Sequence, residues 1–369
     1  MSVFGVVCEY NPFHNGHKYL LDAAHRLGAD ALVCVMSGNS VQRGELAVAD
    51  KYIRAEAAAR EGADLVLELP FPWCSASAEF FARASVKILS GLCDTLIFGS
   101  ECGDIDLLCR VAETADSESF RSEYKQMLTD GRGSAEAYFS LLKEMSGYEL
   151  SSNDLLGVEY IRAIRREGGK MTPVTVKRQG SGYLDDSLKG EFPSATAIRK
   201  AWRTSGVDGA KDHIPPAAFE VYKRAENEGN ITDTSLIDSA VVSFFRLAAG
   251  DSLECFAEAG GGIGGRLCSA ARESVSYEEL VEKAKTKRYT DSKLRRAILF
   301  SMTGVTDEML KSDPEYTTLL AASGKGREIL SANRKNQGLR IITKGADSPR
   351  DSAQFKATER IDALFTLAR

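Results

Sequence analysis

The sequence predicts an α/β protein in which a parallel, Rossmann-like sheet is followed by a mainly helical region. Three observations predict this class. Short apolar runs without polar alternation recur through the first two hundred residues, segments of helical periodicity separate them, and clear strand patterns stop after about residue 205. Apolar strands that alternate with helices are typical of a parallel sheet covered by helices on both faces.

Five segments rich in aliphatic and β-branched residues are the expected strands: 3–8, 31–36, 65–69, 95–98 and 172–176. The segments between them are the expected helices, at 16–27, 50–61, 77–91, within 104–145 and at 154–167. Asp50 is the expected N-cap of the second helix, and Gly91 is the expected stop of the third. Ligands of such sheets bind at the carboxyl ends of the strands, where the polar loops 9–17, 37–45, 99–104 and 177–186 lie.

The second part of the chain reads as helices at 217–228, 235–248, 252–258, 277–285 and 291–301. We place a domain boundary between 203 and 216, which separates a domain at 1–205 from one at 206–369. A candidate strand near 337–345 returns to the core. The glycine-rich run 260–265 lacks the Gly-Lys-Ser/Thr of a P-loop and follows no strand, so we expect a hinge there.

Composition excludes several classes of protein. Hydrophobic residues make up 43% of the 369 residues and charged residues 27%, which is ordinary for a soluble globular protein. No run of 18 apolar residues predicts a membrane span, and the N-terminus enters a strand without a signal peptide. The eight cysteines form no C-x-x-C pair, so we expect buried thiols in the cytoplasm and no protein-bound structural metal.

The distribution of charge indicates a polyanionic partner, although the net charge is −5. Residues 281–300 carry seven Lys or Arg against two acidic residues, and residues 325–344 carry six against one. Local basic surfaces on an acidic protein favour a polyanionic partner that is engaged at one place. The alternative is a solvated helix face.

Two of the four histidines lie in His14-Asn15-Gly16-His17, between the first expected strand and its helix. The N–H groups and dipole of a helix N-terminus favour an anion, and Gly16 lets a phosphate approach the backbone. Imidazole N–H groups there could donate hydrogen bonds to an α-phosphate and a leaving pyrophosphate as negative charge develops on them. The alternative is a surface turn with two incidental histidines.

Three further segments and the single residue Asn153 could contact a nucleotide or substrate. Residues 194–200 begin a helix with hydroxyl caps and contain Arg199, which suits β- and γ-phosphates or merely an ordinary capped helix. Residues 177–183 lead a basic pair into a Gly-rich loop that could bind phosphate or remain solvated. Asn153 could contact a ligand or cap its helix, and loop 37–45 could bind substrate or simply turn.

In combination, these motifs resemble the bacterial tRNA(Met) cytidine acetate ligases of the H-x-G-H nucleotidyltransferase superfamily. The resemblance covers nearly the whole chain. The matching segments, in chain order, are GVVCEYNPFHNGH (5–17), MSGNSVQRGE (36–45), GADLVLELP (62–70), FGSE (98–101), SNDLLGVEYIRA (152–163), VKRQGSGYLD (176–185), SATAIRK (194–200) and TKRYTDSKLRR (286–296). Eight segments in register are far more specific than any one motif.

The resemblance implies an ATP-dependent ligase. The family activates acetate as acetyl-adenylate, releases pyrophosphate, and transfers the acetyl group to N4 of the wobble cytidine of elongator tRNA(Met). For this chain it implies ATP and acetate as substrates, Mg²⁺ on the ATP phosphates, elongator tRNA(Met) as partner and no obligate protein partner. Residues 1–205 would then be the ATP-binding nucleotidyltransferase domain, and residues 206–369 the mainly helical tRNA-binding domain.

The site residues follow from these motifs. His14 and His17 are the expected catalytic residues. The residues expected to bind ATP are Val7, Cys8, Glu9, Tyr10, Asn11, Pro12, Phe13, His14, Asn15, Gly16, His17, Lys18, Tyr19, Leu20, Gly99, Ser100, Asn153, Arg178, Ser194, Thr196 and Arg199. The residues expected at tRNA are Lys285, Lys287, Arg288, Tyr289, Lys293, Arg295 and Arg296, with Tyr289 placed to stack on a base.

Two positions depart from the family pattern. Ser40 stands where an aromatic residue is expected, which weakens a stacking role for its loop. The run 260–265 is richer in glycine than expected, which leaves the geometry of the helical region open.

Two other functions remain open at the level of sequence. A nucleotidyltransferase that adenylylates a small phosphorylated metabolite explains the N-terminal half equally well, but it leaves the basic C-terminal helices unexplained. A nucleotide-regulated RNA-binding protein without turnover is the third possibility. It would bind ATP without ever producing AMP.

Overall fold

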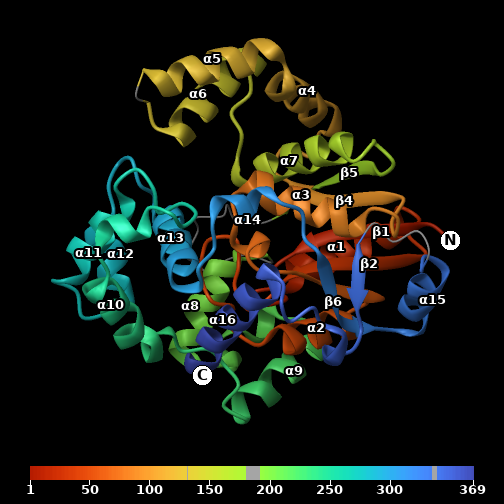
Figure 1. Ribbon diagram of the computed structural model, residues 1–369. Helices are drawn as coiled ribbons and strands as arrows, with labels where there is room; N and C mark the ends of the chain where they lie inside the picture. The colour runs from red at the N-terminus through yellow and green to blue at the C-terminus, as the bar shows by residue number, and fades with distance from the viewer. Residues whose placement is uncertain (131, 180–191, 335–338) are drawn as a thin grey trace.

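The computed structural model describes residues 1–130, 132–179, 192–334 and 339–369, and it contains one seven-stranded sheet (Figure 1). The strand order is β5-β4-β1-β2-β3-β6-β7. The first five strands are parallel: β1 (Val3–Cys8), β2 (Ala31–Ser37), β3 (Leu65–Leu69), β4 (Thr95–Ser100) and β5 (Thr172–Lys177). The α/β class and all five expected strands are confirmed.

Two strands from the end of the chain extend the sheet beyond β3. Strand β6 (Tyr316–Ala322) pairs antiparallel with β3, and β7 (Arg340–Ile342) pairs parallel with β6. The expectation that clear strands stop after residue 205 was therefore wrong for β6. Strand β7 falls within the expected range 337–345, of which residues 337 and 338 lie outside the described part of the chain.

Helices cover both faces of the sheet because alternate strand residues point to opposite sides. One face packs against α3 (Ala78–Leu89) and α7 (Ser152–Arg166). The other packs against α1 (Asn15–Arg26), α2 (Lys51–Arg60), α8 (Ala195–Ser205) and α9 (Pro216–Asn227). Asp50 caps α2 as expected, since its carboxylate accepts a hydrogen bond from the Tyr52 N–H at 2.8 Å.

The layer on the second face continues past residue 205. The 3₁₀ helix η2 (Val207–His213) and α9 contribute Val207, Ala218 and Tyr222 to the apolar cluster that contains the β1 side chains. The Tyr222 hydroxyl accepts a hydrogen bond from the Phe13 N–H at 2.9 Å. Residues placed in the second domain by sequence thus build part of the layer beneath the loop that follows β1.

Two groups of helices stand apart from the sheet in Figure 1. The expected helical stretch 104–145 consists of α4 (Ile105–Asp116), α5 (Glu118–Thr129) and α6 (Ser134–Ser146). The other group, which we call the helical lobe, consists of α10 (Asp238–Leu247), α11 (Ile263–Ala271), α12 (Tyr277–Ala284) and α13 (Asp291–Thr303). The expected helix at 252–258 was wrong, because only the 3₁₀ turn η4 (Gly250–Leu253) forms there.

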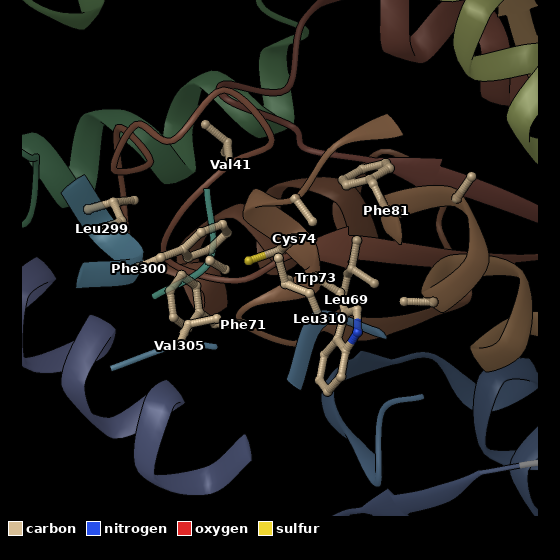
Figure 2. Packing of buried hydrophobic residues seen from close by; sticks show 14 of the residues in the cluster. Val41, Leu69, Phe71, Trp73, Cys74, Phe81, Leu299, Phe300, Val305 and Leu310 are labelled. Carbon is tan, nitrogen blue, oxygen red and sulfur yellow. The ribbon is translucent and has the colours of Figure 1, made fainter. Parts of the chain in front are cut away.

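The lobe is fixed to the sheet by apolar packing (Figure 2). Phe300 of α13 packs against Phe71, which follows β3, with ring centroids 5.9 Å apart, and both side chains are buried. Val41 of loop 37–45 belongs to the same cluster. The last helices alternate with β6 and β7 along the chain. They are α14 (Asp307–Lys311), α15 (Gly324–Ala332) and α16 (Ala353–Leu367).

The glycine-rich run 260–265 leads into α11 and is held by backbone contacts at some of its glycines, and its role as a hinge stays a prediction. The N–H groups of Gly261 and Gly262 donate to the Glu254 carboxylate at 3.0 and 3.1 Å, and Gly262 caps α11 with φ +87°. A Cβ on Gly264 would lie 2.8 Å from the Gly250 carbonyl oxygen. These glycines permit a positive φ and a close backbone approach.

Among the described residues, the helices are all too short or too polar to cross a bilayer.

Candidate active site

The expected site residues meet at the carboxyl edge of the parallel strands. The loop after β1 lies in the middle of the sheet, between the ends of β4 and β5 on one side and of β2 and β3 on the other. Gly99 and Ser100 end β4, and Arg178 directly follows β5. The helix α8 brings the 194–200 motif to the same edge, as its contacts below demonstrate.

The two histidines cap α1 through one nitrogen each. His14 is the N-cap, and its Nδ1 accepts a hydrogen bond from the Gly16 N–H at 3.0 Å. His17 is the third helical residue, and its Nδ1 accepts from the His14 N–H at 3.2 Å. The rings stack with centroids 3.8 Å apart. A neutral imidazole that accepts at Nδ1 carries its proton on Nε2, so both rings have an Nε2–H donor available.

Burial keeps both rings neutral. Desolvation, together with the positive charges of Arg178 and Arg199, lowers the pKa of His14 to about 3. Desolvation also lowers the pKa of His17, with contributions from His14 and Arg178. The imidazoles therefore act as uncharged donors near pH 7, while the two arginines supply a positive potential. This arrangement suits a polyanion such as a triphosphate.

Arg199 joins the second motif to the histidine loop. Its Nη1 donates to the Asn11 carbonyl oxygen at 3.1 Å, and its Nη2 donates to the Thr196 hydroxyl at 3.2 Å. Ser194 caps α8 by accepting from the Ala197 N–H at 3.1 Å. The capped-helix alternative and the site interpretation are thus both compatible with the geometry, since the cap also positions Arg199 beneath the loop after β1.

The ends of β4 and β5 form one wall of the site. Gly99 is close to Arg178, because a Cβ on Gly99 would lie 3.1 Å from the Arg178 Cγ. Glu101 accepts a hydrogen bond from the Asn153 Nδ2 at 2.6 Å and lies 3.8 Å from the Arg178 Nε. Asn153 does not cap α7, because Ser151 holds that position. Its amide instead faces this wall.

Asp154, which the sequence analysis did not select, organises the same wall. It is fully buried and accepts hydrogen bonds from the N–H groups of Glu101 and Cys102 at 2.9 and 3.2 Å. The hydroxyls of Ser151 and Tyr148 donate to it at 2.7 and 2.9 Å. Although desolvation opposes ionisation, these hydrogen bonds lower the pKa of Asp154. It holds the loop after β4 in place.

Several residues in the range 7–20 surround the two imidazole rings. Tyr10 and Phe13 are buried, and their rings lie 4.9 and 5.7 Å from the His17 ring. Cys8, Asn11 and Pro12 are also buried, whereas Val7, Glu9, Asn15, Gly16, Lys18, Tyr19 and Leu20 are partly exposed. The Tyr19 hydroxyl accepts a hydrogen bond from the Gln179 Nε2 at 3.1 Å. Residues 180–186 of the loop that was predicted to bind phosphate lie outside the described residues.

Loop 37–45 forms the opposite wall, and its Ser40 points into the protein. The Ser40 side chain is fully buried and accepts a hydrogen bond from the Ser75 hydroxyl at 2.8 Å. A residue at position 40 therefore does not face a ligand in this chain. Arg54 of α2, which the sequence analysis missed, ties the walls together by donating to the carbonyl oxygens of Glu9 and Ser37 at 2.6 and 3.1 Å.

The helical lobe abuts this second wall. The Tyr277 hydroxyl donates to the Gly44 carbonyl oxygen at 3.3 Å, and a Cβ on Gly44 would lie 2.5 Å from the Arg296 backbone nitrogen. Lys285, Lys287 and Arg288 are exposed in the turn between α12 and α13. The cations of Arg288 and Lys293 lie 5.6 and 5.9 Å from the centre of the Tyr289 ring, and the Tyr289 hydroxyl donates to the Gly261 carbonyl at 2.6 Å.

Two of the expected RNA contacts are instead internal ion pairs. Arg295 is buried, and its guanidinium binds Glu278 and Asp291. Arg296 makes two hydrogen bonds of 2.8 Å with Glu258. Their charges are neutralised within the lobe, so we correct the expectation that these two arginines bind tRNA. The basic character of the segment rests on its other lysines and on Arg288.

The first part of the second basic segment, helix α15, begins at the edge of the sheet away from the site. Helix α15 follows β6, which runs antiparallel to β3 and therefore ends at the amino edge of the parallel strands. The Lys325 Nζ donates to the Asp30 carbonyl oxygen, just before β2. This places α15 at the end of the sheet opposite to His14.

Comparison with known proteins places the chain among similar sequences and folds. A family model described as HIGH Nucleotidyl Transferase matches residues 1–369. A tRNA(Met) cytidine acetate ligase from Caldanaerobacter subterraneus subsp. tengcongensis is 35% identical, over 100% of this chain and 96% of that protein.

Two crystal structures of Thermotoga maritima TmcAL have the same fold. The apo form is 37% identical in sequence and matches with a TM-score of 0.90. The match covers 98% of this chain and 92% of the Thermotoga chain. The form bound with alpha-thio ATP is 36% identical with a TM-score of 0.88 and the same coverage.

Proposed function

Because the chain belongs to the HIGH nucleotidyl transferase family and to its tRNA(Met) cytidine acetate ligases, we propose that it is an ATP-dependent ligase that acetylates N4 of the wobble cytidine of elongator tRNA(Met). The reaction consumes acetate and ATP and releases AMP and pyrophosphate. The observation that carries the proposal is the stacked pair of neutral imidazoles beside Arg178 and Arg199 at the carboxyl edge of the sheet.

In the first half-reaction, a carboxylate oxygen of acetate attacks the α-phosphorus of ATP, and the bond to the β-phosphate oxygen breaks. Charge moves onto the α-phosphate oxygens and the leaving pyrophosphate. The Nε2–H groups of His14 and His17 donate to these oxygens as charge develops on them. Arg178 and Arg199 hold the leaving phosphates, and the wall of Gly99, Ser100 and Asn153 binds the nucleoside.

A Mg²⁺ ion fits this site as a companion of the nucleotide. Within the described ranges, no group of three or more His, Cys, Asp or Glu side chains has the arrangement of a metal site. The phosphate oxygens of ATP and water would then supply most of its ligands, as is usual for Mg²⁺. The ion would neutralise charge on the phosphates.

In the second half-reaction, the N4 amine of cytidine attacks the carbonyl carbon of acetyl-adenylate. The amine is a weak nucleophile, so positioning of the unstacked base supplies much of the rate. An anticodon base already lies in a single-stranded loop. We propose that Lys285, Lys287, Arg288, Tyr289 and Lys293 contact the RNA, because they lie on the lobe that abuts loop 37–45.

One assay tests the proposal. Purified protein is incubated with radiolabelled acetate, ATP and bulk tRNA, and both AMP and label in RNA are measured. We expect stoichiometric AMP and N4-acetylcytidine in the tRNA digest. No acetate label in RNA, together with transfer of the adenylyl group of ATP to an added phosphorylated metabolite, would favour the other nucleotidyltransferase function. Bound ATP that never yields AMP would favour an RNA-binding protein without turnover.

The proposed RNA surface predicts a change in salt dependence. Lys287→Ala combined with Arg288→Ala should weaken tRNA binding about tenfold or more and reduce the slope of log K against log salt by about 2, because two phosphate contacts are lost. Filter binding of tRNA at several salt concentrations measures this. The matched control removes Lys325 and Arg327 from α15, at the opposite edge. An equal loss of binding in that control would contradict the assignment.

A further inference from the structure

Acetyl transfer to an exocyclic amine releases a proton, and the residues described above leave its acceptor unassigned. This proton belongs to the second half-reaction, so the identity of its acceptor rests on the proposed function. The acceptor has to lie where the cytidine amine meets the acetyl-adenylate, and it has to be a base near neutral pH.

The two histidines are unsuited to this task. Each Nδ1 already accepts a backbone hydrogen bond, and each Nε2 carries the ring proton. Burial lowers both pKa values, so neither ring readily takes up a second proton. They are donors to phosphate throughout the cycle.

The sheet order divides the site into two halves. Apart from the phosphate-binding residues of α8, the residues assigned to ATP from outside the loop after β1 and helix α1 end β4, follow β5 or lie on α7. The tRNA cytidine that accepts the acetyl group therefore approaches from the other half of the site. There β2 and β3 end, and the helical lobe abuts Gly44. The base for the amine has to stand between the two halves.

Glu9 occupies that boundary. It directly follows β1, between the ATP half and loop 37–45, and its Oε1 accepts a hydrogen bond from the Gln42 N–H at 2.9 Å. Its carbonyl oxygen is held by the buried Arg54 at 2.6 Å. The side chain is partly exposed, and the charged groups that face it are Arg199, Glu45 and Arg43.

The other carboxylates of the edge are engaged elsewhere. Glu68 makes a buried salt bridge of 2.8 Å with Lys51. Glu101 receives hydrogen bonds from Ser151 and Asn153 on the ATP wall. Glu45 pairs with the Arg199 guanidinium at 3.8 Å.

The surroundings of Glu9 also make it a stronger base than a surface glutamate. Desolvation is the largest effect and raises the pKa of Glu9. The Gln42 N–H and Arg199 lower it by less, and Glu45 adds a small increase that Arg43 opposes. A carboxylate whose pKa moves toward neutrality accepts a proton more readily.

We propose that the Glu9 carboxylate is the general base of acetyl transfer. The N4 lone pair forms a bond to the acetyl carbonyl carbon, and Glu9 takes a proton from N4. The bond from that carbon to the phosphate oxygen then breaks, and its electron pair leaves with AMP. The products are N4-acetylcytidine, AMP and a protonated Glu9, which returns its proton to water.

Glu9→Gln tests this step with little change of shape, because the amide oxygen still accepts the Gln42 N–H. Single-turnover transfer from preformed acetyl-adenylate to tRNA is measured across pH, beside acetate-dependent ATP–pyrophosphate exchange. In the wild type, transfer rises with pH as Glu9 ionises, through a pKa above that of an ordinary glutamate. We expect Glu9→Gln to lower transfer about 100-fold, to abolish that rise and to lower exchange by a much smaller factor.

Two further variants sharpen the result. Glu9→Asp keeps a carboxylate and should restore part of the rate together with the rise with pH. Glu45→Gln removes the neighbouring carboxylate and should keep the rise, since Glu45 is not the base. A Glu9→Gln enzyme that keeps the rise with pH, or that loses exchange and transfer in equal proportion, would overturn the assignment. A wild-type enzyme that forms no acetylated tRNA would instead refute the proposed function.

Discussion

His14→Asn should lower acetate-dependent ATP–pyrophosphate exchange by about 10²–10³-fold, the loss typical of removing one preorganised donor to a developing negative charge. Asparagine is a good N-cap, and its side-chain oxygen can still accept the Gly16 N–H that the His14 Nδ1 accepts. The Nε2–H donor is the part that is lost. Exchange rates and the melting temperature of the same preparation separate chemistry from folding.

Two controls bracket this result. His14→Ala removes the cap as well and should cost about a further 1 kcal/mol of stability. His25→Asn changes a histidine near the other end of α1, whose Nδ1 is close to the Ala29 carbonyl oxygen, and should leave exchange unchanged. If His14→Asn exchanges at a rate close to wild type, His14 plays no part in phosphate activation.

The low pKa of His14 adds a pH condition to the same experiment. A group with a pKa of about 3 stays neutral from pH 6 to 8, so protonation of His14 should not affect exchange in that range. Exchange that falls below pH 6.5 with the ionisation of His14, followed by its NMR resonance, would contradict the neutral pair.

The parallel core was predictable because its signals are local. Strand β2 is apolar on both faces from Ala31 to Met36, and Asp50 marks the start of α2 one residue before it. Strand β6 lacks such a signal, since much of Tyr316–Ala322 is only partly buried and the strand takes its identity from pairing with β3. That partner lies far away in the sequence.

The site divides in the same way. The roles of His14, His17 and Ser194 at helix N-termini could be predicted, because a helix cap is recognised from three or four adjacent residues. The roles of Arg54 and Asp154 could not be predicted from the sequence, because they bind backbone groups of loops that are distant in the chain. A count of charges likewise could not show that Arg296 is neutralised by Glu258, 38 residues away.

Arg54→Met should destabilise the protein by about 3 kcal/mol or more and abolish exchange, although no atom of Arg54 is proposed to touch a substrate. The guanidinium is fully buried and donates to the carbonyl oxygens of Ala49, Glu9, Ser37 and Gly38. Methionine retains much of the volume but no donor, and each buried carbonyl left without a partner costs about 1–3 kcal/mol. Urea unfolding and exchange measure the two effects.

Arg60→Met on the same helix is the matched control. Arg60 is half exposed and pairs with Glu56 one turn earlier, so its loss should change stability by less than about 1 kcal/mol. The contrast is informative because Arg54 holds both the turn that carries Glu9 and the end of β2. If Arg54→Met unfolds at the same urea concentration as wild type and still exchanges pyrophosphate, the walls of the site are held by other contacts. The catalytic geometry would then not depend on this arginine.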